Sequence, residues 1–176
     1  MPPIKSRIWF FAWFLIVVFG FVSLAVKPAQ AAEKPKKSNV VVYDSKKFID
    51  WRMRLQDKIS EKERQNILFA ISEYYFWAND FSDARRALRE SVSVAPVNIS
   101  TFLANVYLYA IAKRYGYETQ VAAIKKDLFQ DRFVLLFDKF KKLTYTSLWK
   151  NKYEVHYFRD RIEVFLNGEM FEEITP

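Results

Sequence analysis

Cysteine is absent from this sequence of 176 residues, and histidine occurs only once, at position 156. Without thiols, the chain forms no disulfide, no thiolate metal site, no cysteine nucleophile and no lipid anchor on cysteine. A single histidine, with no cysteine and no local carboxylate cluster, does not supply the ligands that zinc requires. A small hydrolase centred on His156 stays open as an alternative, although the G-x-S-x-G pattern of a nucleophile elbow is absent.

Glycine is also scarce, with only Gly20, Gly116 and Gly168 in the whole chain. We therefore expect no glycine-rich loop that could cradle a phosphate. Glu172 and Glu173 are neighbours in an expected strand, where they would point to opposite faces and could not work as an acid/base pair. These shortages together predict a protein without catalytic residues, metal ligands or a cofactor.

The excess of positive charge is small, with 28 Lys and Arg against 20 Asp and Glu and a net charge of +8. Three of the basic residues, Lys5, Arg7 and Lys27, precede a candidate cleavage site, so the rest of the chain is less basic. This balance falls short of the clustered basic face that nucleic-acid-binding proteins present. We therefore expect no nucleic acid among the partners.

Residues 1–31 have the three parts of a secretory signal peptide. A basic head at Lys5 and Arg7 is followed by an apolar run from Ile8 to Val26, and Ala29-Gln30-Ala31 forms a small-x-small cleavage site. The alternative is an uncleaved anchor in the inner membrane, because the run approaches the roughly 20 residues that span a bilayer. In both cases we expect the remainder to be exported and periplasmic.

A charged linker with a proline follows at residues 32–39, and residues 40–147 carry mostly helical periodicity. A β-branched run at Val40–Asp44 predicts one short strand. We expect helices at residues 46–59, 61–78, 82–94, 101–115 and 118–143, the last with a break near Gln130-Asp131. Their ends are assigned from capping and breaking residues: Ser45, Ser60 with Glu63, Pro96, Asn98 or Ser100, and Gly116.

The C-terminal part, residues 148–176, is rich in β-branched and aromatic residues. Asn167-Gly168 predicts a two-residue hairpin turn, because both positions of such a turn need positive φ. We expect strands at Ile162–Leu166 and Glu169–Ile174 after a first strand at Lys152–Phe158, which makes a small antiparallel β-hairpin or meander. Alternation in the first strand would place His156 towards solvent, opposite a buried Val155.

Within the helical part, residues 65–96 carry a sparse pattern of apolar and small residues: Leu68, Ile71, Ser72, Tyr75, Phe81, Ala84, Leu88 and Pro96. Small side chains at Ser72 and Ala84 would let two helices approach closely. The segment resembles one tetratricopeptide repeat (TPR), a helix–turn–helix unit of about 34 residues. The resemblance implies a mainly α fold of antiparallel, TPR-like helical hairpins in a degenerate array. The alternative is an irregular helical domain in which one hairpin matches the pattern.

TPR proteins bind peptides or partner proteins in a groove lined by the first helix of each unit. The matching positions in this chain are Asn66, Phe69, Glu73 and Phe76, with Arg85 and Arg89 of the next helix as rim contacts or solvated charge. Phe69 and Phe76 are seven residues apart and share a helix face. They would instead be core residues if the preceding helix covers them with Phe48, Trp51 and Leu55.

A basic and aromatic run extends from Phe137 to Tyr153. Lysines interleaved with aromatic residues suit contact with an anionic membrane surface or an acidic partner. The residues that we assign to this contact are Lys139, Lys141, Lys142, Trp149 and Lys150. The alternative is a solvated lysine face beside aromatic core residues.

These observations predict a non-catalytic adaptor that is exported to the bacterial periplasm and binds another envelope protein or peptide through its helical hairpins. The edge of the C-terminal hairpin would be available for strand addition. The alternative is a structural subunit of an envelope machine or filament, such as a flagellar motor or a secretion apparatus, that assembles through this edge and the helix faces.

Overall fold

The computed structural model describes residues 43–94, 97–137 and 141–176, all within one compact unit that spans Lys37–Pro176. The expected signal segment, the linker and most of the strand expected at Val40–Asp44 lie outside the described residues. Tyr43 and Asp44, the end of that run, are not in a strand. In the described ranges, no helix has the length and apolar character needed to cross a membrane.

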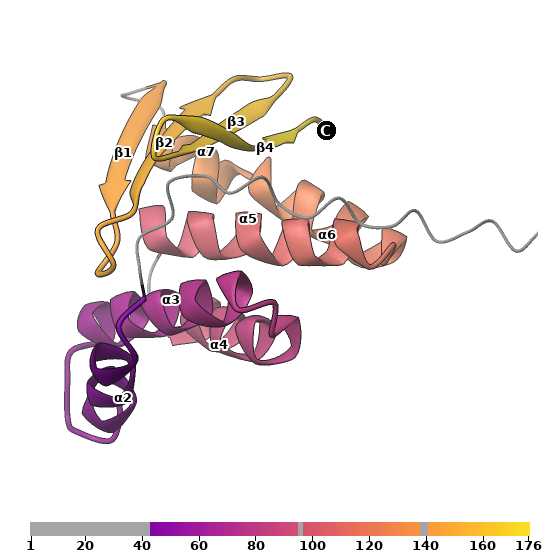
Figure 1. Cartoon of the computed structure of the whole chain (residues 1–176). Helices are drawn as coiled ribbons and strands as arrows, with labels where there is room; N and C mark the ends of the chain where they lie inside the picture. Colours follow the sequence, from indigo (N-terminus) through magenta and orange to yellow (C-terminus); the bar gives the residue numbers. More distant parts are fainter. Residues whose placement is uncertain (1–42, 95–96, 138–140) are drawn as a thin grey trace, which may run out of the picture. The chain divides into compact units, whose positions relative to one another are not determined.

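The described residues form a mainly helical protein with a C-terminal antiparallel sheet, as predicted (Figure 1). The helices are α2 (Ser45–Arg54), α3 (Glu61–Trp77), α4 (Phe81–Val94), α5 (Ile99–Arg114), α6 (Glu118–Leu128) and α7 (Asp131–Phe137). The strands are β1 (Lys142–Thr146), β2 (Lys152–Tyr157), β3 (Ile162–Leu166) and β4 (Glu169–Ile174). They pair antiparallel in the order β1-β2-β3-β4, so β1 and β4 are the edge strands.

Side-chain caps set the starts of three helices. Ser60 accepts a hydrogen bond from the backbone of Glu63 at the start of α3, and Asn98 caps α5. At α2 the cap is Asp44 and not the predicted Ser45, because the Asp44 carboxylate accepts from the backbone of Lys46. α2 also ends at Arg54, earlier than predicted, since the backbone then tightens into a turn in which Asp57 N donates to Arg54 O.

The helix predicted for residues 118–143 is wrong in its last part. The chain is helical in α6 and α7, with a break near Gln130 as expected, but Lys142–Thr146 forms strand β1. Leu143 pairs with Val155 and Tyr145 pairs with Tyr153 of β2. Exposure alternates along β1, as in a strand with one face towards the core. Residues 142–146 form a strand because β2 supplies the neighbouring strand with which they pair.

The predicted hairpin at the C-terminus is confirmed. Asn167 and Gly168 have φ of 52° and 88° between β3 and β4, which is the conformation that the two-residue turn requires. The preceding strand β2 ends at Tyr157, one residue earlier than predicted.

One core joins the helices to the sheet. α3 and α4 pack against each other, and Ser72, Ala84 and Leu88 are all fully buried. Phe69 of α3 meets the ring of Tyr153 from β2, with ring centroids 5.9 Å apart. The sheet therefore covers a face of α3 that the sequence left open to a partner.

Candidate functional site

The turn between β1 and β2, residues 147–151, is attached to α3 by buried side chains. Trp149 is almost fully buried, and its Nε1 donates a hydrogen bond of 2.7 Å to the Ala70 carbonyl. Its ring packs edge-on against Trp51 of α2 at a centroid distance of 4.5 Å. A turn that would otherwise be a free loop is thus held against two helices.

Beneath this turn, the carboxylate of Glu73 is fully buried. Its Oε1 accepts hydrogen bonds from the Tyr153 hydroxyl at 2.5 Å and from Asn151 Nδ2 at 2.8 Å. The Tyr153 hydroxyl also contacts the hydroxyl of Tyr107 at 2.6 Å, and Asn151 Nδ2 contacts the Tyr43 hydroxyl at 3.1 Å. The network links α3, α5, β2 and the start of α2.

Burial governs the protonation of this carboxyl. Loss of solvent raises the pKa of Glu73 to about 7, and the hydrogen bonds from Tyr153 and Asn151 offset only part of that effect. The Ser147 side chain also lowers the pKa of this carboxyl, as the third hydrogen-bonding contributor after Tyr153 and Asn151. Burial also raises the pKa values of Tyr153, Tyr107 and Tyr43, with the charge of Glu73 as the second cause. These tyrosines therefore remain neutral at ordinary pH.

Next to the attached turn, α2 and α3 border a groove of about 530 Å³. Trp51, Ile67 and Leu148 supply its apolar surface. Its polar lining comes from Asp50, Arg54, Ser60, Lys62, Glu63 and Asn66. Arg54 Nε donates to Glu63 Oε1 at 3.1 Å, an ion pair that joins the two helices beside the groove.

The residues predicted to line a partner groove on α3 separate into different environments. Phe69 and Glu73 are fully buried against the protein's own sheet, and Phe76 is half-buried beside Tyr107. Phe69 and Phe76 pack in the core, but not under the preceding helix as the alternative from the sequence supposed. The sheet and α5 cover them, whereas Phe48, Trp51 and Leu55 pack in a separate cluster with Ile67, Ala70 and Ile71. Asn66 alone reaches the groove described above, where its Oδ1 also accepts from Ser100.

Arg85 and Arg89 lie one helical turn apart on α4, away from Asn66 and the groove lining. Arg89 is exposed, and the guanidinium of Arg85 lies over the ring of Tyr117 at 5.9 Å. The structure therefore does not bring the six predicted partner-binding residues together in one site.

The residues assigned to membrane or acidic-partner contact are also divided. Lys141, Lys142 and Lys150 are exposed, whereas Trp149 is buried, and Lys139 lies outside the described residues. Trp149 thus contacts α2 and α3 rather than solvent. The exposed lysines belong to β1 and to its flanking turns.

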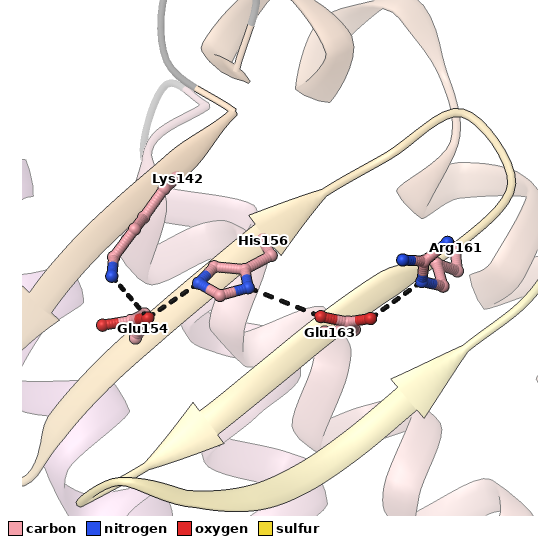
Figure 2. Close-up of polar contacts among 5 residues, drawn as sticks. All are labelled: Lys142, Glu154, His156, Arg161 and Glu163. Atoms are coloured by element: carbon pink, nitrogen blue, oxygen red, sulfur yellow. Dashed lines mark hydrogen bonds and ion pairs between the residues drawn. The ribbon is translucent and has the colours of Figure 1, made fainter.

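His156 lies in a chain of polar contacts that crosses the outer face of the sheet, together with Lys142, Glu154, Glu163 and Arg161 (Figure 2). Its Nε2 is 2.7 Å from Glu154 Oε1, and its Nδ1 is 3.4 Å from Glu163 Oε2. Lys142 contacts Glu154, and Arg161 contacts Glu163, at the two ends of the chain. Val155, its neighbour, is fully buried, as the alternation predicted.

This chain of charges pairs acids with bases rather than grouping metal ligands. The Lys142 ammonium lowers the pKa of Glu154, with His156 as the next contributor, and the Arg161 guanidinium lowers the pKa of Glu163. In the described ranges, no group of three or more acidic or histidine side chains is placed to hold a metal ion. No serine hydroxyl is hydrogen-bonded to His156 among these residues either.

Sequence reasoning missed the side chains that surround Glu73 and the groove. Tyr153 and Tyr107 were expected only as strand and helix residues without a polar role, and Asn151 and Leu148 were not selected. The alternation of Tyr153, Val155 and Tyr157 with polar residues indicated one buried strand face, but not the polar contacts made there.

Comparison with protein-family models, with curated proteins and with solved structures finds no match to this chain.

Proposed function

We propose that this chain is a non-catalytic adaptor, exported to the bacterial periplasm, that binds a segment of another envelope protein in the groove between α2, α3 and the β1–β2 turn. The observation that carries the proposal is the composition of this groove. Apolar side chains of Trp51, Ile67 and Leu148 are surrounded by charged and amide groups. Protein interfaces have the same anatomy, an apolar centre with a polar rim.

α2 also exposes apolar side chains outside the groove lining. Ile49 and Met53 are 56% and 64% exposed and lie one turn apart. Exposed large apolar side chains that lie together are typical of a surface that a partner covers. The rigid attachment of Trp149 supports the same function, because a preorganised surface loses less entropy on binding.

The proposal includes a TPR-like unit formed by α3 and α4. The packing of α3 against α4, the burial of the small residues Ser72 and Ala84, and the short connection at residues 78–80 support this description. In this chain the partner would bind beside α2, since the C-terminal sheet packs on Phe69 and Glu73.

The test replaces one groove residue with a charged residue and measures the affinity for the partner protein. The envelope partner is first identified by a photo-crosslinker at position 148 and is then purified. Leu148→Glu should weaken its affinity by about tenfold or more, because a buried contact of this kind contributes about 1.4 kcal/mol or more. Leu148 is 39% exposed, so this substitution leaves the core intact.

Leu135→Glu is the matched control, since Leu135 of α7 is 72% exposed and far from the groove lining. It should bind the partner as the parent does. Equal affinity of the Leu148 and Leu135 variants, or crosslinking from position 135 to the same protein, would remove the groove from the proposal.

A structural subunit is the second candidate, favoured by the open sheet. β1 and β4 each pair with only one strand within the described residues, so each leaves one edge for another chain. Light scattering after size exclusion distinguishes the two functions. An adaptor of this kind should elute as a monomer, whereas a subunit that assembles through its strand edges should form larger species as concentration rises.

A further inference from the structure

Two exposed tyrosines project from the turn between α5 and α6. Tyr115 and Tyr117 are 52% and 42% exposed, and their rings stack with a centroid distance of 5.7 Å and an interplanar angle of 15°. Gly116 lies between them with φ of 68°, and the backbone of Tyr117 donates to the Ala112 carbonyl. With the bond from Gly116 N to Lys113 O, this contact forms the turn that commonly ends a helix at glycine, and it fixes the backbone from which both rings project.

Arginines surround this pair of rings. The guanidinium of Arg85 lies 5.9 Å from the Tyr117 ring centre, and that of Arg114 lies 4.7 Å from the ring of Phe81. Phe81 in turn packs edge-on against Tyr115 at 5.9 Å. Arg89 is exposed one helical turn after Arg85. We call Arg85, Arg89, Arg114, Tyr115 and Tyr117 the arginine–tyrosine patch.

The acidic side chains of α4 do not neutralise this patch. Asp83 pairs with Arg86, and Glu90 pairs with Arg64 at 2.9 Å. Within residues 43–94, 97–137 and 141–176, none of Arg85, Arg89 and Arg114 forms an ion pair. These three guanidinium groups therefore have no ion-pair partner among the described carboxylates.

We propose that the arginine–tyrosine patch is a second docking surface, which binds an acidic segment of a partner polypeptide. Guanidinium groups bind carboxylates with two parallel hydrogen bonds, and stacking on a ring leaves their N–H groups free to do so. Tyrosine and arginine are also the residue types that are enriched in protein interfaces. This site is separate from the groove at α2 and does not depend on it.

The geometry favours a polypeptide over other anionic partners. Single-stranded nucleic acids stack their bases on aromatic faces, but Tyr115 and Tyr117 stack on each other, so the faces between them are occupied. Binding to a lipid surface needs large apolar side chains that enter the interface, and the exposed side chains of the patch are tyrosines and arginines. An acidic peptide needs only the guanidinium groups and the ring edges.

The probe is a fluorescent twelve-residue peptide in which glutamate alternates with leucine, titrated against residues 37–176 of the protein, the compact unit, and against the full chain. We expect saturable binding that weakens as salt is added, because the contacts are charge pairs near the surface. Arg89→Glu should weaken binding by about tenfold, the effect expected for reversal of one guanidinium contact. Arg89 is exposed, so this variant tests the patch while leaving the buried core unchanged.

Arg159→Glu is the matched control, since Arg159 is exposed in the turn between β2 and β3, outside the patch. It should bind the peptide like the parent. Tyr117→Ala should also weaken binding, because it removes the ring that supports Arg85.

Three results would overturn the proposal. Equal losses in the Arg89 and Arg159 variants would show that the peptide responds only to net charge. Stronger binding to vesicles of phosphatidylglycerol, or to a twelve-nucleotide single strand, with the same dependence on Arg89 would assign the patch to a membrane or a nucleic acid. No saturable binding of the peptide at low salt would exclude the site.

Discussion

The hydroxyl of Tyr153 donates a hydrogen bond of 2.5 Å to the carboxylate of Glu73, and both side chains are buried. This contact joins β2 to α3 across the core. It also places an ionisable group where its charge is poorly solvated, and that has a measurable consequence for stability.

We expect the protein to be more stable in mild acid than at alkaline pH, because of Glu73. Its pKa is raised from 4.5 to about 7 by burial, so folding takes up a proton between these values. The stabilising contribution is complete below pH 4.5 and is lost as the pH rises through 7. The shift corresponds to about 3 kcal/mol in the free energy of unfolding.

Glu73→Gln should therefore flatten the dependence of unfolding free energy on pH between 5 and 8, measured by urea denaturation. At pH 8 the variant should be the more stable protein, because an amide keeps an acceptor for Tyr153 and carries no charge. Tyr153, Tyr107 and Tyr43, which surround the carboxyl, do not titrate in this range. Glu118→Gln, at an exposed carboxylate, should keep the parent slope, and an unchanged slope in Glu73→Gln would refute the assignment.

Trp149→Ala should lower the free energy of unfolding by about 3 to 5 kcal/mol, the usual cost of removing a large buried aromatic side chain. Trp149→Phe should cost less, because it loses the hydrogen bond to Ala70 but retains most of the packing with Tyr43 and Trp51. Guanidinium chloride denaturation measures both variants. A loss below 1 kcal/mol for the alanine variant would mean that the β1–β2 turn is not attached to α3 in solution.

Phe69→Ala should destabilise the protein by about 3 to 5 kcal/mol, because Phe69 is fully buried among the rings of Tyr107, Tyr145 and Tyr153. Ile49→Ala, at a side chain that is 56% exposed, should change stability by about 0.5 kcal/mol or less. Thermal unfolding followed by circular dichroism compares them. Tolerance of Phe69→Ala would indicate that this ring faces a partner groove.

Gly168→Ala should cost about 1 kcal/mol, because φ at this position is 88°, a conformation that alanine adopts poorly. A Cβ there would meet no atom within 4 Å, so the loss is conformational and not steric. Gly168→Asn should cost less, since asparagine tolerates positive φ better than alanine does. Equal stability of the parent and the alanine variant would contradict the two-residue turn.

Lys142→Met should raise the pKa of Glu154 towards its ordinary value, because the Lys142 ammonium is the largest cause of its lowering. Arg161→Met should act on Glu163 instead, at the other end of the chain in Figure 2. NMR titration of the two carboxyl groups reads both effects in one experiment. Each variant is the control for the other, and identical responses would show that the chain of contacts is not formed in solution.

Local signals in the sequence determined most of the helical part. Ser60 and Asn98 occupy cap positions because their side chains accept hydrogen bonds from backbone N–H groups three residues later. Gly116 ends α5 because it adopts the positive φ that the turn after the helix needs. Asn167-Gly168 specified its hairpin turn for the same reason. Such signals need no knowledge of the rest of the chain, so they could be read before the structure was known.

The tertiary structure alone decided which surfaces remain exposed. Leu143 and Tyr145 form a strand because β2 supplies their partners, and Trp149 is buried because α2 and α3 enclose it. On an isolated helix Glu73 would be a candidate groove residue, but the sheet buries it in the folded protein. Periodicity shows that a helix has an apolar face. What covers that face depends on contacts between residues as far as 108 positions apart, and a local sequence pattern does not show which residues these are.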